Sequence, residues 1–71
     1  MPEMQMVVSS NIEAIGYAAE CQQLHVRFSK SGTTYVYHGV EEWVYSEFMA
    51  AESKGQYLNA NIKNVYQHSQ L

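Results

Sequence analysis

The stretch that decides the fold is residues 24–38, which reads LHVRF at 24–28, SKSG at 29–32 and TTYVYH at 33–38. Its first part alternates apolar and polar residues, as a strand does when only one of its faces is buried. Its last part is rich in β-branched and aromatic residues, which favour strands. Between them, Gly32 can adopt the positive φ that a tight turn often requires. These residues predict an antiparallel β-hairpin.

The register of this hairpin follows from its turn. If the turn pairs Ser29 with Gly32, Val26 faces Tyr35, and Tyr35 and Tyr37 both lie on the core side of the sheet. A slip of one residue would turn the charged side of the strand toward the core, which is costly, so we expect a firm register. The opposite, solvated face of the hairpin would then carry Gln23, His25, Arg27, Thr34, Val36 and His38.

Patterns on either side of the hairpin complete the fold. Residues 12–17 have strand character and lead into the hairpin through a polar turn. After Gly39, Val40, Val44 and Phe48 recur at helical spacing, and a second helix follows Ser53, which has a glutamine at capping-box spacing. We therefore expect an α+β domain, a three-stranded antiparallel β-meander followed by two short helices packed on one face of the sheet.

The length and composition indicate one small domain with a thin core. A chain of 71 residues buries only about 60% of the surface that its unfolded form exposes. Cys21 is the only cysteine, so no internal disulfide can staple the fold, and a homo-oligomer is one way to gain stability. We divide the chain into a flexible N-terminal segment (1–8), the domain itself (9–66) and a C-terminal tail (67–71).

The same composition bears on compartment and partners. A single cysteine, no signal peptide and no apolar run long enough to cross a bilayer predict a cytoplasmic protein without a membrane partner. The net charge is −3, with only four Lys and Arg residues. Because unspecific affinity for a nucleic-acid duplex depends on cations that neutralise phosphates, four are too few for tight binding of that kind. Selective contact with RNA stays open.

Several short motifs, in order, resemble the KTSC domain family. They are SSNI at 9–12, IGY at 15–17, YVY at 35–37 and SKGQYLN at 53–59, and the similarity spans roughly residues 9–66. The family is a short module found at the C-terminus of some lysyl-tRNA synthetases and alone in small bacterial and phage proteins. The resemblance implies a domain for which RNA binding has been suggested. Where many members open the helix with proline, this chain has Glu41 and Glu42, which add negative charge.

The candidate binding residues lie on the predicted outer face and in two turns. We expect RNA or a protein partner to contact His25, Arg27, Lys30, Thr34, His38 and Lys54. The leading interpretation is a non-catalytic binding module that recognises RNA, and the alternative is a protein-interaction or homo-oligomeric accessory module. Steep salt dependence would distinguish phosphate contacts from an apolar interface.

Some of these residues have both a functional and a purely structural interpretation. His25 and His38, with Arg27 between them, are the residue types of a phosphodiester-cleaving acid and base, but nothing in the sequence supplies an orienting carboxylate. Tyr35 and Tyr37 could stack on bases, although the register favours packing against the core. The SKG sequence at 53–55 could hold a phosphate, although helix capping explains it more simply. We expect no catalytic residue, no metal and no cofactor.

Overall fold

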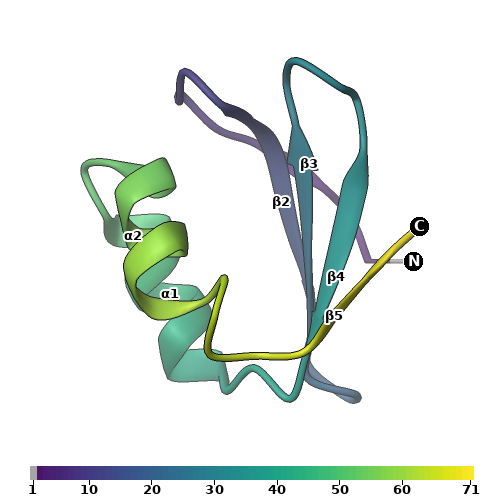
Figure 1. Ribbon diagram of the computed structural model, residues 1–71. Coiled ribbons are helices and arrows are strands. Elements are labelled where there is room, and N and C mark those ends of the chain that lie inside the picture. Colours follow the sequence, from purple (N-terminus) through teal and green to yellow (C-terminus); the bar gives the residue numbers. More distant parts are fainter. Residues whose placement is uncertain (1) are drawn as a thin grey trace.

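The computed structural model describes residues 2–71. Met1, the first residue of the predicted N-terminal segment 1–8, therefore lies outside the described residues. Figure 1 shows one sheet with both helices on one side of it and both ends of the chain toward the other. In chain order the elements are β1 (Gln5–Met6), β2 (Ile12–Ala18), β3 (Gln23–Phe28), β4 (Thr34–His38), α1 (Glu42–Ala50), α2 (Lys54–Asn61) and β5 (His68–Gln70).

The sheet has five antiparallel strands in the order β1-β2-β3-β4-β5. The α+β class and the two helices on one face are confirmed, but the predicted number of three strands is wrong. The two further strands come from the ends of the chain: β1 pairs Gln5 with Ile15, and β5 pairs Ser69 with Val36. Strands of two and three residues are too short to show a period in the sequence. They form because the edges of a meander offer unpaired N–H and C=O groups.

The register of the central hairpin is confirmed. Val26 pairs with Tyr35 and Leu24 pairs with Tyr37, as the turn geometry requires. The turn itself closes with Gly32 at φ +68°, a value that suits glycine. Tyr37 is 3% exposed and Tyr35 is half-buried, so the core face of β4 lies where the sequence predicts it.

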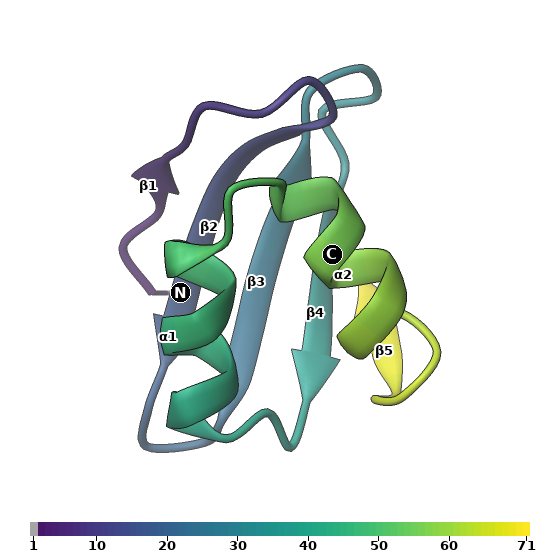
Figure 2. The same ribbon diagram turned by 90° about the vertical axis from the view of Figure 1, so that its left-hand side faces the viewer.

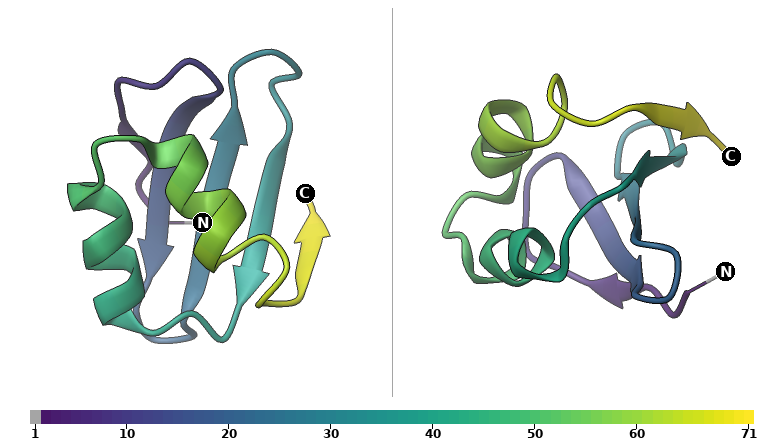
Figure 3. Two further views of the ribbon diagram at one scale, coloured as in Figure 1. Left: turned by 60° about the vertical axis from the view of Figure 1, so that its left-hand side comes forward. Right: turned by 90° about the horizontal axis from the view of Figure 1, so that it is seen from below.

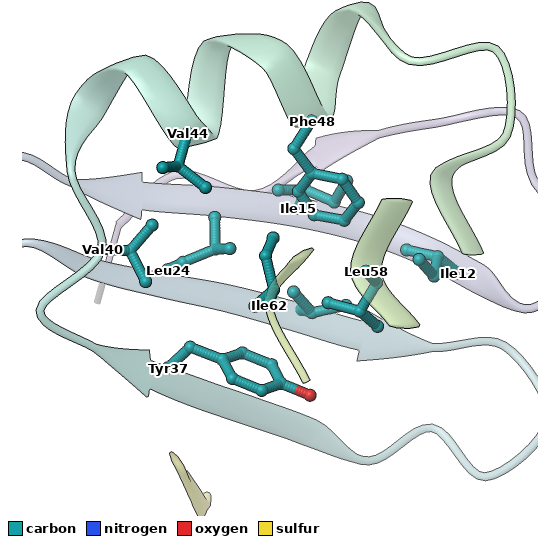
Figure 4. Close-up of a cluster of buried hydrophobic side chains, with 10 residues drawn as sticks. Ile12, Ile15, Leu24, Tyr37, Val40, Val44, Phe48, Leu58 and Ile62 are labelled. Carbon is teal, nitrogen blue, oxygen red and sulfur yellow. The ribbon is translucent and has the colours of Figure 1, made fainter. Parts of the chain in front are cut away.

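The hydrophobic core fills the space between the helices and the sheet. Figure 2 shows α1 and α2 lying across β2, β3 and β4, and Figure 4 shows side chains from both layers meeting between them. Phe48 and Val44 point from α1 toward Ile15 and Leu24 on the sheet. The core cluster consists of Ile12, Ile15, Leu24, Val26, Tyr37, Val40, Val44, Phe48, Leu58 and Ile62. The apolar stripe predicted for α1 is therefore the face that packs against the sheet.

A side-chain hydrogen bond caps α2, and another links the residue before α1 to the chain after α2. The Ser53 hydroxyl accepts from the backbone N–H of Gln56 at 3.3 Å, which confirms Ser53 as the cap of α2. At the start of α1, the Tyr66 hydroxyl donates to a carboxylate oxygen of Glu41 at 2.6 Å. This bond joins the chain after α2 to the beginning of α1, and it lowers the pKa of Glu41 below its ordinary value.

Candidate functional site

The outer face of the sheet is not the open polar platform that the sequence predicts. His25, expected to be exposed, is only 5% exposed, and Val36 beside it is buried as well. The reason is that the N-terminal segment folds back over this face. A Cβ built on Gly16, which pairs with His25, would lie 2.9 Å from the backbone oxygen of Glu3 and 2.7 Å from the sulfur of Met4.

Arg27 is also less free than predicted. Its Nε lies 3.6 Å from a carboxylate oxygen of Glu13, and both side chains are about one-third exposed. Glu13 is the extra residue where the register of β2 against β3 shifts, and this bulge brings its carboxylate beside Arg27. An ion pair of this kind is worth little in stability, but it neutralises part of the charge that Arg27 would offer to a phosphate.

The remaining outer-face candidates differ in exposure. His38 is exposed, and its Nε2 lies 3.1 Å from the hydroxyl of Ser69 on β5. Thr34 is half-buried opposite Arg27. His25 has no hydrogen-bond partner for either ring nitrogen among residues 2–71, and burial, with the nearby His38, lowers its pKa below the ordinary 6.5. The neutral imidazole is therefore the form that this environment favours.

A second region, far from His25, brings together polar segments that the sequence places more than forty residues apart. A cavity of about 360 Å³ lies between the loop before β2 and the turn between the helices. Its lining consists of Val8, Ser9, Ser10, Asn11, Glu52, Ser53, Lys54, Gly55, Gln56 and Asn59. We call the end of the molecule formed by this lining and the adjoining β3–β4 turn (29–33) the polar end. Figure 1 shows both loops and the turn at the same end of the fold.

Short contacts hold the polar end together. The amide nitrogen of Asn11 lies 3.8 Å from the position that a Cβ on Gly55 would take, so the loop before β2 meets the first turn of α2. The backbone oxygen of Asn11 accepts from the N–H of Ser29 at 2.9 Å, which links the same loop to the β3–β4 turn. Lys54 donates to the backbone oxygen of Ala51 at 2.7 Å, and this bond holds its ammonium beside the end of α1.

Charge is distributed unevenly along the fold. Three of the four Lys and Arg residues lie at or next to the polar end: Lys30 in the β3–β4 turn, Lys54 at the start of α2, and Arg27 near the end of β3. Three of the seven carboxylates lie at the opposite end, Glu20 in the β2–β3 turn and Glu41 and Glu42 at the start of α1, whereas Glu52 lines the cavity at the polar end. The backbone bond from Val40 to Gln22 joins those two segments.

The structure therefore divides the predicted site. Lys30 and Lys54 belong to the polar end and Arg27 adjoins it, whereas His25 lies under the N-terminal segment and His38 lies beside β5. Ser10, Asn11 and Asn59 line the cavity as well, although they were not predicted as candidates from the sequence. Their signal was present in the motifs at 9–12 and 53–59, which the fold brings to opposite sides of one cavity.

The fold and this site define a small α+β domain with helices on one face of an antiparallel sheet and a polar cavity built from two motifs. A model of the KTSC domain matches residues 8–66, and the chain belongs to the KTSC domain family. A Tsukamurella paurometabola protein without a descriptive name is 45% identical over 60 residues, which are 84% of this chain and 88% of that protein. The crystal structure of a KTSC domain protein from Yersinia pestis superposes with a TM-score of 0.95 at 35% identity and covers 100% of this chain and 99% of that one.

Among residues 2–71, no helix is both long and apolar enough to span a bilayer. Within the same residues, no three His, Cys, Asp or Glu side chains gather in a way that could hold a metal ion.

Proposed function

We propose that this KTSC domain is a non-catalytic binding module that holds single-stranded RNA at its polar end. The observation that carries the proposal is a cavity lined mostly by hydroxyl and amide groups, with Lys54 in its lining and Lys30 in the adjoining β3–β4 turn. Phosphates are bound by cations together with neutral donors, and base edges and 2′-hydroxyls are read by amides and hydroxyls. The polar end supplies both sets within one region.

The start of α2 adds donors to this region. The first backbone N–H groups of a helix have no partner within it, and they suit an anion. In α2 the Ser53 hydroxyl accepts from Gln56, while Gly55 offers a backbone without a side chain. Lys54 is held beside the same turn by its bond to Ala51. A phosphate placed there would meet a positive charge, a helix start and an uncrowded backbone together.

The acidic remainder of the chain restricts the ligand. With a net charge of −3, the domain repels long duplexes, and the carboxylates at the far end oppose a nucleic acid that wraps the whole molecule. A short single strand that touches only the polar end avoids them. We therefore expect weak binding that depends steeply on salt.

The test is fluorescence anisotropy of a labelled single-stranded RNA of about ten nucleotides, titrated at low and at moderate salt. We expect binding at low salt, weaker binding for Lys30→Ala and Lys54→Gln, and unchanged binding for the matched control Lys63→Ala, which removes the cation outside the polar end. Equal losses in all three variants would point to unspecific charge attraction. No binding by the wild-type protein at low salt would refute the proposal.

One observation favours a protein partner as the second candidate. Trp43 is 61% exposed on α1, and Glu42 and Glu47 are exposed on the same helix. An exposed tryptophan among carboxylates suits a partner that carries basic and apolar side chains, because aromatic residues are enriched at interfaces. This function would be favoured over the first if the wild-type protein bound no RNA but captured such a partner, and if Trp43→Ala abolished that capture.

A further inference from the structure

Residues 2–4 lie across the outer face of the sheet at Gly16 and lead into the edge strand β1, and we call residues 2–7 the strap. Figure 3 shows this end of the chain on the side of the sheet away from the helices. The strap is held by few contacts: β1 pairs only Gln5 and Met6 with β2, and the N–H of Val7 donates to the oxygen of Glu13 at 3.2 Å. The strap crosses the sheet at Gly16, where the missing side chain leaves room for the backbone of Glu3 and the sulfur of Met4.

His25 lies on the same face, paired with Gly16 on one side and Val36 on the other. It is 5% exposed, and neither ring nitrogen has a hydrogen-bond partner among the described residues. A buried polar group without a partner is unusual in a folded protein and opposes the closed arrangement. Protonation of His25 would raise the free-energy cost of the closed arrangement, since it would place an unpaired charge beneath the strap.

The groups around His25 offer little compensation for such a charge. From β2 the neighbours are Gly16 and two alanines, from β4 Val36 lies opposite, and from β5 Ser69 pairs with Val36. A cavity of about 510 Å³ beside the imidazole is lined by residues of the strap, the β2–β3 turn and the C-terminal end. The titratable and charged groups that line this cavity or lie on this side of the sheet are Glu3, Glu13, Tyr17, Glu20, Cys21, Arg27, His38 and the terminal carboxylate at Leu71.

Among these, Glu3, Glu20 and Leu71 are exposed, and Glu13 is paired with Arg27. His38, on the same face, opposes a positive charge on His25. The balance of contacts therefore favours the neutral ring while the strap is closed.

We propose that the strap is a pH-sensitive cover, which closes over the outer face while His25 is neutral and detaches when His25 takes up a proton. Opening would expose the strip formed by Gly16, His25 and Val36 on the sheet. The proposal does not depend on RNA binding, because the polar end lies at a different part of the fold.

The direction of the pH effect follows from proton linkage. In the open state the imidazole titrates near its ordinary pKa of 6.5, whereas in the closed state burial holds its pKa lower. The open state therefore binds more protons once the pH falls below about 6.5, and acid favours opening. One proton can change the open-to-closed ratio by at most about tenfold per pH unit in that window.

The experiment is NMR of the full chain from pH 7.5 to 5, with amide exchange corrected for the intrinsic effect of pH. We expect the protection of the Val7 amide to fall by several-fold below pH 6.5, while amides of the central strands, such as that of Val26, keep theirs. His25→Phe should hold the strap closed and remove the pH effect, and the matched control His38→Gln should retain it.

Gly16→Ala provides the opposite variant, because its Cβ would collide with the backbone of Glu3. We expect its Val7 amide to lack protection at every pH while Val26 stays protected. Val7 protection that does not change with pH in the wild type, or a pH effect that survives in His25→Phe, would overturn the proposal. If Gly16→Ala loses the protection of Val26 as well, the substitution has unfolded the sheet, and the comparison of wild type with His25→Phe decides alone.

Discussion

Asn11 lies directly over Gly55: its amide nitrogen is 3.8 Å from the position where a Cβ on Gly55 would stand. Asn11 belongs to the motif at 9–12 and Gly55 to the motif at 53–59, which are far apart in the sequence. Their contact joins the two sides of the cavity at the polar end. The distance is an ordinary van der Waals separation, so the glycine is not required by a clash with Asn11. In the proposed function, an RNA phosphate approaches the backbone of α2 at this glycine.

The first prediction concerns Gly55. Gly55→Ala should leave the free energy of unfolding unchanged or raise it by up to about 1 kcal/mol, because alanine favours a helix over glycine. The same change should weaken RNA binding, because the added methyl group obstructs the start of α2. Urea unfolding and RNA anisotropy on the same samples measure the two effects. Unimpaired RNA binding by a stable Gly55→Ala variant would show that the ligand does not reach this turn.

The second prediction concerns the core. Phe48 is fully buried between α1 and the sheet, so Phe48→Ala should cost about 3–5 kcal/mol. A loss of that size is close to the whole stability of a marginal domain. Phe28 is only half-buried, and Phe28→Ala is a control that should cost clearly less. Thermal melts followed by circular dichroism check this order, and equal costs would show that the core is centred elsewhere.

The third prediction concerns the hydrogen bond between Tyr66 and Glu41. Because this bond lowers the pKa of Glu41, it contributes stability above the ordinary value of 4.5 and loses that contribution as the pH falls through the lowered pKa. Tyr66→Phe should therefore reduce the free energy of unfolding at pH 7 and flatten its fall between about pH 5 and 3. Denaturant unfolding at several pH values measures this.

The control for that experiment is Tyr45→Phe. The Tyr45 ring stacks on Tyr17 at a centroid distance of 4.8 Å, and the substitution retains a ring there. Its pH profile should match that of the wild type. A Tyr66→Phe profile parallel to the wild type would mean that the Glu41 bond contributes no stability.

The fourth prediction concerns Arg27. Its pairing with Glu13 at 3.6 Å is partly exposed, so Arg27→Ala should change the free energy of unfolding by less than about 1 kcal/mol. Because the carboxylate already neutralises part of its charge, the loss of RNA affinity should be smaller than for Lys30→Ala. Glu13→Gln should do the opposite and strengthen RNA binding by freeing Arg27. Weaker binding in Glu13→Gln would place Glu13, not Arg27, in contact with the ligand.

The sequence predicts the central hairpin and α1 well because their patterns are long and regular. Alternation over residues 24–28 fixes which face of β3 is buried, and a four-residue turn fixes the partner of each residue on β4. The two edge strands could not be predicted, since two or three residues carry no period. They pair only because the meander is already in place.

The candidate site could be predicted only in part, for a related reason. Alternation shows that His25 faces away from the helices, but not that the strap returns to cover it. Gly16 was the available signal, because a glycine inside a strand often marks a close backbone approach. The polar end depends on the contact between residues 9–11 and 53–59, a long-range meeting that no local pattern contains.

The most direct test of the central claim is NMR mapping of amide shifts while a short single-stranded RNA is added at low salt. We expect the largest shifts at residues 8–11, 29–33 and 53–59, we expect them to fade as salt rises, and we expect Lys30→Ala to weaken them. Absence of any shift at low salt would contradict RNA binding at the polar end, and so would shifts confined to α1 around Trp43.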